Sequence, residues 1–135
     1  MSGETGHRPI LAPVVYPETR PFWDAAAQGR LLLKRCVACG EAHYFPRSLC
    51  PFCLSDRTEW QQASGRGSIH TYSVTRRAGP VVYVIAYVTL DEGPTMMTNI
   101  IDCEPDSVRI GQRVEVVFKP SDGGPPVPMF RPVAA

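Results

Sequence analysis

The stretch CVACGEAHYFPRSLCPFC, residues 36–53, holds four of the five cysteines of this chain in two C-x-x-C pairs. Each pair turns tightly enough to present two sulfurs to one ion, and two pairs complete the four ligands of a tetrahedral thiolate site. The spacing therefore predicts one zinc ion bound by Cys36, Cys39, Cys50 and Cys53. Two alternatives stay open, because sulfur sites also suit iron, as in rubredoxin, and C-x-x-C pairs also act as redox dithiols.

The zinc ion is expected to hold the fold rather than to catalyse a reaction. A ribbon of about 30 residues is too small to be stable on a hydrophobic core alone, whereas a structural zinc ion contributes on the order of 10–16 kcal/mol. Four cysteines also close the ligand shell and leave no position for water or substrate. Gly40 follows the first pair, where a knuckle turn favours positive φ. Leu54 stands at the corresponding place after the second pair, so that knuckle is expected to close differently or to rely on Ser55.

The sequence before the ribbon predicts an arm and one short helix. Residues 1–17 contain three prolines and no regular apolar period, which is typical of an extended arm. Thr19 as N-cap, Pro21 in the first turn and Gly29 as a stop predict a helix of two to three turns. We therefore assign residues 18–56 to the helix and the zinc ribbon together.

The sequence after the ribbon changes to strands. Val, Ile, Tyr and Thr dominate the segments 67–77, 81–90, 95–102 and 113–119, and a shorter fifth strand is expected at 58–63. Gly65 and Gly67 are expected to mark a bulge or a bend. Five antiparallel strands within residues 57–135 fit a small OB-fold barrel, so the expected class is mainly β.

One segment near the C-terminus is expected to break the strand pattern. Residues 120–128 read PSDGGPPVP, which is rich in proline and glycine. We expect a long loop here, and in OB-type barrels such loops often carry ligand contacts.

The composition excludes several classes of function. Lys and Arg number 14 against 13 Asp and Glu, the net charge is +1, and like charges form no block, which argues against electrostatic binding to nucleic acid or anionic lipid. No apolar run reaches the ~18 residues of a membrane span, and the first residues lack the pattern of a secretion signal. A soluble, cytoplasmic protein is expected, and there the thiols stay reduced and free for metal.

No group of residues predicts a catalytic centre. Cys103 has no partner base in a recognisable motif and is expected to be a buried or incidental thiol. His43 lies between the cysteine pairs, where four sulfurs already complete a site, and His70 alternates within a strand. Asp91 and Glu92 look like paired carboxylates, but they occupy a predicted turn.

The order of the motifs resembles a known family of small proteins with a rubredoxin-like zinc ribbon followed by an OB-fold, associated with acyl-CoA enzymes and formerly catalogued as a domain of unknown function. The resemblance covers about residues 16–132. The segments that carry it are ETRPFWDAAAQGRLLLKRCVACGEAHYFPRSLCPFCLS (18–55), SGRGSIHTYSV (64–74), VIAYVTLDEG (84–93), VRIGQRVEVVF (108–118) and MFRP (129–132). The ordered set is far more specific than any one motif.

The resemblance implies a function that the residues alone do not reveal. Members of that family typically act as partner subunits of thiolase-type enzymes, which include thiolases, acyl-transferring condensing enzymes and retro-aldolases acting on acyl-CoA. It implies that this chain is a non-catalytic accessory subunit in a hetero-oligomer. The ribbon and helix would dock on the partner, and the barrel would shape or cover the partner's acyl-CoA site.

Three basic residues are candidates for contact with CoA phosphates or with the partner surface, namely Arg76, Arg77 and Lys119. Arg76 and Arg77 end a predicted strand, where a solvated pair that protects the strand edge is the alternative interpretation. A second function remains to be weighed, because zinc ribbons and OB barrels also form single-stranded nucleic-acid-binding modules. The net charge of +1 and the lack of a basic stripe argue against it.

Overall fold

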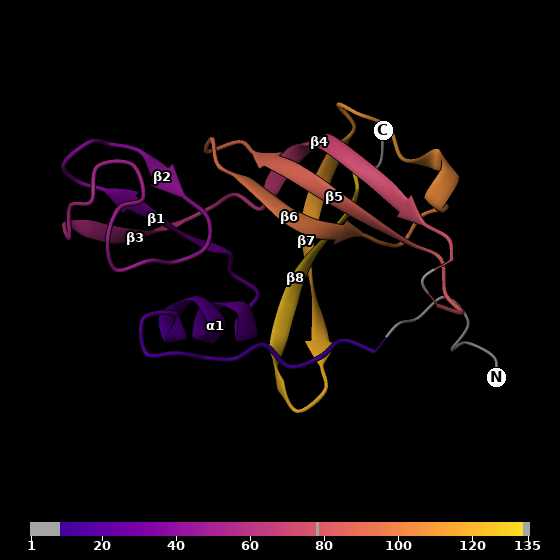
Figure 1. The fold of residues 1–135 in the computed structure, drawn as a ribbon, viewed down its shortest axis with the longest axis horizontal. Coiled ribbons are helices and arrows are strands. Elements are labelled where there is room, and N and C mark those ends of the chain that lie inside the picture. Colours follow the sequence, from indigo (N-terminus) through magenta and orange to yellow (C-terminus); the bar gives the residue numbers. More distant parts are fainter. Residues whose placement is uncertain (1–8, 78, 134–135) are drawn as a thin grey trace.

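The computed structural model describes residues 9–77 and 79–133, which form one short helix and two sheets (Figure 1). A small sheet and helix α1 lie at one end of the molecule, and a barrel forms the other end. This confirms the expected class, mainly β with one short helix, a zinc ribbon and a five-stranded OB-type barrel. Part of the predicted arm, residues 1–8, lies outside the described residues. No helix of the described ranges combines the length and apolar character that crossing a membrane requires.

Helix α1 (Arg20–Ala27) has the boundaries that the sequence predicts. Thr19 stands at the N-cap position, although its Oγ1 bonds with the backbone of Tyr16 instead of the helix. At the other end Gly29 takes a φ of 76°, and its N–H donates to the carbonyl of Ala26 while the N–H of Arg30 donates to Ala25. This pair of bonds is the Schellman motif, which satisfies the last carbonyls of a helix.

The ribbon sheet contains three strands in the order β2-β1-β3: β1 (Leu32–Cys36), β2 (Ala42–His43) and β3 (Thr58–Gln62). β3 pairs with β1 over its whole length, from Leu32↔Gln62 to Cys36↔Thr58. The expected fifth strand of the barrel, 58–63, therefore belongs to the ribbon instead. That assignment was wrong because strand propensity does not say which neighbour a strand pairs with.

The barrel closes in the order β4-β5-β6-β8-β7, and a short 3-10 helix, η1 (Pro105–Ser107), follows β6. Its strands are β4 (Arg66–Thr75), β5 (Tyr83–Leu90), β6 (Thr95–Ile100), β7 (Arg113–Ser121) and β8 (Gly124–Pro132). The fifth barrel strand is thus β8, and the predicted loop at 120–128 is in fact the β7–β8 hairpin.

The prolines of β8 explain why the hairpin was mistaken for a loop. A proline cannot donate a ladder hydrogen bond, so it is tolerated where a strand edge is little paired. β8 pairs with β7 along most of its length, but it pairs with β6 only at Ile100↔Phe130. The edge toward β6 therefore has little need of backbone donors.

One core joins the helix, the ribbon and the barrel. Its buried members include Phe22 of α1, Leu33 of β1 and Phe130 of β8, which are all at most 1% exposed. The predicted bend near Gly65 and Gly67 takes a different form, because the register of β4 against β5 shifts between Ile69 and Thr71. Gly67 is instead a site of close packing, where an added Cβ would lie 2.4 Å from the backbone oxygen of Thr89.

Gly67→Ala is therefore expected to destabilise the barrel by about 2 kcal/mol or more, because strand β5 must move to admit the methyl group. Gly79→Ala is the matched control, since nothing lies within 4 Å of the added Cβ, and it is expected to change stability by less than about 0.5 kcal/mol. Urea unfolding of both variants measures the difference. Equal midpoints would contradict the packing described for Gly67.

Candidate functional site

Four cysteine sulfurs from the two knuckles of the ribbon meet at one point. All lie within 4.8 Å of one another, with Cys36 and Cys53 at 3.6 Å and Cys39 and Cys50 at 3.7 Å. Four sulfurs placed tetrahedrally at ~2.3 Å from one zinc ion are about 3.8 Å apart. The cluster thus fits a single structural zinc ion with a closed ligand shell.

The first knuckle closes as its glycine predicts. The N–H of Cys36 donates to the carbonyl of Glu41 over 2.9 Å, and the N–H of Gly40 donates to the carbonyl of Cys36 over 2.8 Å. Gly40 has a φ of 82°, in the left-handed region that glycine adopts without strain.

The second knuckle repeats this geometry without a glycine. The N–H of Cys50 donates to the carbonyl of Ser55 over 2.8 Å, and the N–H of Leu54 donates to that of Cys50 over 2.9 Å. Leu54 has a φ of 66°, so a leucine takes the conformation that Gly40 takes in the first knuckle. The expectation of a different closure was wrong, because both pairs present their sulfurs to the same point. The alternative, reliance on Ser55, is confirmed, since its carbonyl accepts from Cys50 as that of Glu41 does from Cys36. A branched side chain in this region costs roughly 1–2 kcal/mol.

The surroundings of the sulfurs give the thiols of Cys36 and Cys39 different pKa values. The N–H of Cys39 donates to Sγ of Cys36 and, as the main cause, lowers the pKa of Cys36 to about 6. For Cys39 the N–H of Glu41 favours the thiolate, but burial and the neighbouring sulfurs together outweigh it and raise the pKa to about 12. Zinc binding at neutral pH must therefore displace protons, so zinc affinity should fall as the pH falls.

His43 lies outside the group of ligand atoms. It is buried in β2, and neither ring nitrogen has a hydrogen-bond partner among the described residues. Burial lowers its pKa, and the charges of Lys34 and Arg47 add to this effect. The four sulfurs complete the metal site without the imidazole.

Two of the three candidate phosphate-binding residues form ion pairs with the segment that follows β6. Arg76 pairs with Asp106 in η1, and Lys119 lies 4.0 Å from Asp102. Arg77 is exposed just beyond the end of β4. Two of these three cations are thus paired with acids only a few residues apart in the chain.

Asp91 and Glu92 have the structural role that the turn predicts. Asp91 accepts two hydrogen bonds of 2.8 Å from Arg113, and this contact lowers the pKa of Asp91. Glu92 accepts from the backbone N–H of Ser64 over 2.8 Å. These contacts tie the β5–β6 turn to β7 and to the connection from the ribbon.

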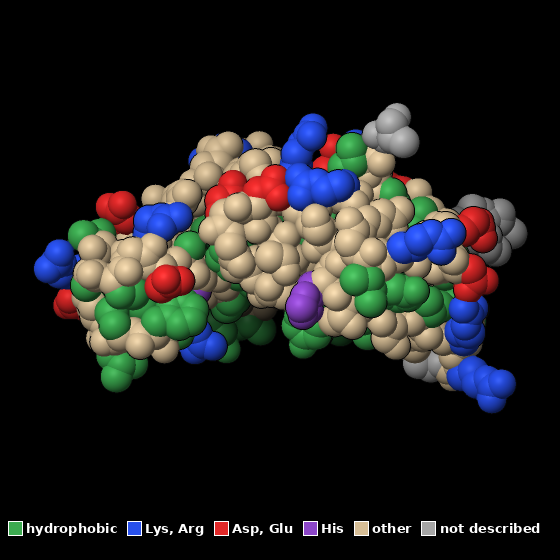
Figure 2. Space-filling view, turned by 90° about the horizontal axis from the view of Figure 1, so that it is seen from above, with side chains coloured by type: hydrophobic (Ala, Val, Ile, Leu, Met, Phe, Trp, Pro, Cys, Tyr) green, Lys and Arg blue, Asp and Glu red, His purple; other side chains and the backbone are tan. Residues whose placement is uncertain are grey.

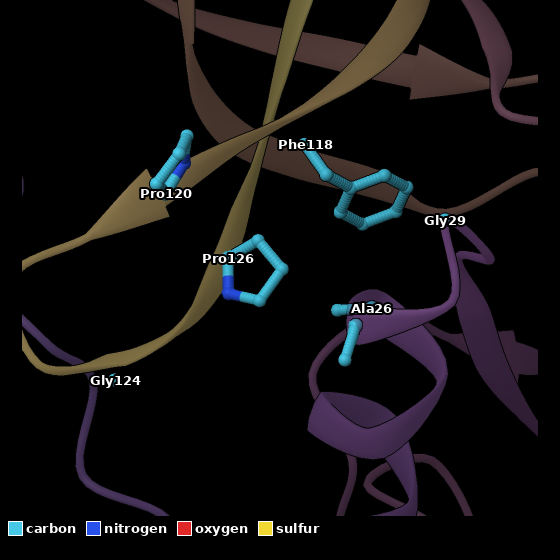
Figure 3. A pocket seen from close by; sticks show the side chains of 7 residues that line it. Ala26, Gly29, Phe118, Pro120, Gly124 and Pro126 are labelled. Carbon is cyan, nitrogen blue, oxygen red and sulfur yellow. The ribbon is translucent and has the colours of Figure 1, made fainter.

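Two apolar hollows were not foreseen from the sequence, because they lie on opposite faces of the hairpin that was mistaken for a loop. Successive side chains of a strand point to opposite faces. Phe118 and Pro126 face α1 and line a shallow notch of about 390 Å³ together with Ala26 (Figure 3). Lys119 and Val127, which are cross-strand partners, line a larger groove of about 850 Å³ on the other face.

Loss of one ligand tests the metal site. Cys36→Ser is expected to lose bound zinc and the ordered structure of the ribbon, because three thiolates no longer complete the tetrahedral shell. Cys103→Ser is the matched control, since Cys103 is not part of the cluster, and it should retain one zinc per chain. Zinc content and thermal unfolding measure both variants. Full zinc content and unchanged unfolding in Cys36→Ser would exclude the structural role.

Substitution of the strained Leu54 is expected to raise the stability of the ribbon, whereas loss of a zinc ligand lowers it. Leu54→Gly is expected to stabilise the ribbon by about 0.5–1 kcal/mol, because relief of the left-handed strain exceeds the added chain entropy. Gly40→Ala, at the equivalent position, should destabilise it by a similar amount. Chemical unfolding of the zinc-loaded chains checks the pair. A loss of stability in Leu54→Gly would show that the leucine is not strained.

Comparisons with known proteins agree with this geometry. Residues 23–59 match the family described as "ChsH2, rubredoxin-like zinc ribbon domain", and residues 60–119 match "ChsH2, C-terminal OB-fold domain". A "DUF35 domain-containing scaffold protein" of Methanothermobacter thermautotrophicus is 38% identical over 91 residues, which cover 63% of this chain and 68% of the relative. A "Probable enoyl-CoA hydratase alpha subunit" of Thermomonospora curvata is 35% identical over 116 residues, 82% of this chain but only 36% of the relative.

Solved structures give the same family. A chain of the "Ltp2-ChsH2(DUF35) aldolase" superposes with a TM-score of 0.76 at 32% identity, covering 89% of this chain and 98% of that one. A DUF35 protein of unknown function from Sulfolobus solfataricus shares the fold, with a TM-score of 0.63 at 15% identity. With its closed four-cysteine site, its OB-type barrel and these relatives, the chain belongs to the DUF35 family, in the branch whose zinc-ribbon and OB-fold domains are described for ChsH2.

Proposed function

We propose that this chain is a non-catalytic accessory subunit of a thiolase-type enzyme that acts on acyl-CoA. The observation that carries the proposal is the similarity to a chain of the Ltp2-ChsH2(DUF35) aldolase, which covers 89% of this chain and 98% of that one. The relatives described as DUF35 scaffold proteins support the same role. The chain would act in a cytoplasmic hetero-oligomer, and the partner would perform the chemistry.

Exposed apolar side chains support the ribbon as the surface that docks on the partner. Among the described residues, 13 large apolar side chains are exposed, and five of these fall within residues 37–54. We call these five the ribbon surface: Val37, Phe45, Leu49, Phe52 and Leu54. Figure 2 shows hydrophobic side chains exposed over the ribbon half of the molecule, with charged side chains between them. Such a mixture of apolar anchors and charged neighbours is typical of protein interfaces.

Leu54 is the member of this surface whose presence most needs a partner to explain it. Its side chain is 72% exposed, so it contributes little to the core, and its backbone conformation is one that favours glycine. Strain of this kind persists only where the surrounding structure imposes it, and it is concentrated at functional sites. We therefore assign Leu54, with Phe52 beside it in the same knuckle, to the centre of the docking surface.

The partner's thioester would enter beside the barrel. Arg76, Arg77 and Lys119 remain our candidates for contact with the CoA phosphates, and Lys119 belongs to the wall of the groove next to the hairpin. Guanidinium and ammonium groups are the usual protein donors to phosphate. The partner's own active site would select the acyl group, which we place in lipid or aromatic acid metabolism.

Co-expression tests the proposed function. The chain is expected to co-purify with the acyl-CoA enzyme encoded beside its gene, and that enzyme should lose activity or solubility when produced alone. Thiolysis, condensation and retro-aldol assays with and without the chain measure the effect. A chain that stays monomeric and leaves every such enzyme unchanged would overturn the proposal.

Leu54→Gly tests the docking surface, because it separates stability from binding. It is expected to weaken the complex by tenfold or more, equivalent to at least about 1.4 kcal/mol, while the isolated chain becomes no less stable. Met97→Ser is the matched control, since Met97 is exposed at 60% on the barrel and outside the ribbon surface. Titration calorimetry with the partner measures both. Equal affinities for the two variants would exclude the ribbon surface as the docking site.

A further inference from the structure

The four zinc ligands are not equally shielded from solvent. Cys36 and Cys50, the first cysteine of each knuckle, are 0% exposed, whereas Cys39 and Cys53, the second of each, are exposed. All four must be thiolates to bind zinc, and the susceptibility of cysteine to oxidation follows thiolate character and exposure. Each knuckle therefore presents one accessible thiolate to an oxidant in solution.

Each exposed cysteine has a buried neighbour in the other knuckle. Sγ of Cys53 lies 3.6 Å from Sγ of Cys36, and Sγ of Cys39 lies 3.7 Å from Sγ of Cys50. A disulfide bond is about 2.05 Å long, so each pair of sulfurs has to approach by roughly 1.6 Å to form one. The buried sulfur is thus placed to react with the oxidised form of the exposed one, and the resulting bond would join the two knuckles.

The turns that hold the sulfurs also hold part of the ribbon surface. Val37 lies between the two cysteines of the first knuckle, and Phe52 lies between those of the second. The N–H of Phe52 donates to Sγ of Cys50 over 3.4 Å, and the N–H of Val37 donates to the carbonyl of Arg57, beyond the second knuckle, over 2.7 Å. Movement of the sulfurs would therefore displace the apolar side chains that we assign to docking.

From these observations we infer that the ribbon is a redox-sensitive switch. A hydroperoxide oxidises the zinc ligands to disulfides between the knuckles, zinc is released, and the ribbon surface loses its shape. The oxidation rests on the metal site alone, whereas its effect on assembly rests on the proposed function. Since coupling of this kind is reciprocal, a docked partner would also protect the exposed thiolates and so retain the metal.

The oxidation balances with hydrogen peroxide as the oxidant. The thiolate of Cys53 attacks one peroxide oxygen, the O–O bond breaks, and the hydroxide that leaves takes a proton to become water. The thiolate of Cys36 then attacks the sulfenic sulfur, the S–S bond forms, the S–O bond breaks, and a second hydroxide takes a second proton. The two thiolates lose the two electrons that the peroxide gains. Cys39 and Cys50 would react in the same way with a second peroxide.

The zinc-loaded Cys103→Ser chain tests the oxidation, because its only cysteines are the four ligands. The chain is treated with excess hydrogen peroxide, and zinc release is followed with a colorimetric chelator. Free thiols are counted by mass spectrometry after alkylation with N-ethylmaleimide. We expect each chain to release its zinc as the free thiols fall from four to two and then to none. A phosphine reductant with added zinc should restore both the thiols and the bound metal.

Tryptic digestion shows which disulfides form, since Arg47 separates the two knuckles. Cleavage after Arg35, Arg47 and Arg57 yields the peptides 36–47 and 48–57, each with one C-x-x-C pair. Disulfides between the knuckles keep these two peptides joined until they are reduced, which is the expected result. Disulfides within the C-x-x-C pairs would leave the peptides separate.

Protection by the partner tests the link to docking. With the partner at ten times its Kd, zinc release from the unmodified chain should slow about tenfold. Leu54→Gly should lower this protection to about twofold or less at the same partner concentration, because its docking is expected to be tenfold weaker. Met97→Ser, exposed on the barrel, is the matched control and should keep full protection. The oxidised chain should in turn bind the partner at least tenfold more weakly than the zinc-loaded chain.

The outcomes separate this inference from the proposed function. Retention of zinc and four thiols under peroxide, oxidation to sulfinic acids that the phosphine does not reverse, or separate tryptic peptides would overturn the switch. Unchanged affinity of the fully oxidised chain for the partner would overturn its effect on docking. The isolated chain decides the oxidation even if no complex forms, and a chain that forms the complex but resists peroxide refutes the switch alone.

Discussion

Closure of four thiolates on one zinc ion is the constraint on which the rest of the structure depends. The ribbon strands are only two to five residues long, too short to form a stable sheet without help. Cys36 is the last residue of β1, so the ion fixes the end of the strand that pairs with β3. Leu33 of the same strand belongs to the core shared with α1 and the barrel. Through this strand the metal orients the ribbon relative to the barrel as well as within itself.

Several features cost stability in the isolated chain. The ribbon surface exposes five large apolar side chains, and one of them, Leu54, is held in a left-handed conformation. In the core, the buried indole N–H of Trp23 has no acceptor among the described residues. A closed zinc shell has no position left for a substrate.

The β7–β8 hairpin separates helix α1 from the groove on its other side. One face, with Phe118 and Pro126, meets α1, which precedes the ribbon. The opposite face, with Lys119 and Val127, lines the groove under the arm. Because alternate residues of the same strands serve the two faces, displacement of the hairpin would affect both at once.

Local patterns in the sequence determined the zinc ligands, the end of α1 at Gly29 and the OB class, because ligand spacing, a left-handed glycine and strand composition act over a few residues. Features that depend on contacts between distant parts of the chain were decided only by the tertiary structure. It assigned β3 to the ribbon through pairing with β1, and it turned the proline-rich segment 120–128 into a hairpin whose edge toward β6 needs few donors. It also forced Leu54 into the turn that Gly40 adopts freely, because one ion must be reached by both knuckles. One wall of the groove, finally, comes from the arm, which pairs with the hairpin tip through Leu11 and Asp122, and no local pattern specifies a contact between residues more than a hundred positions apart.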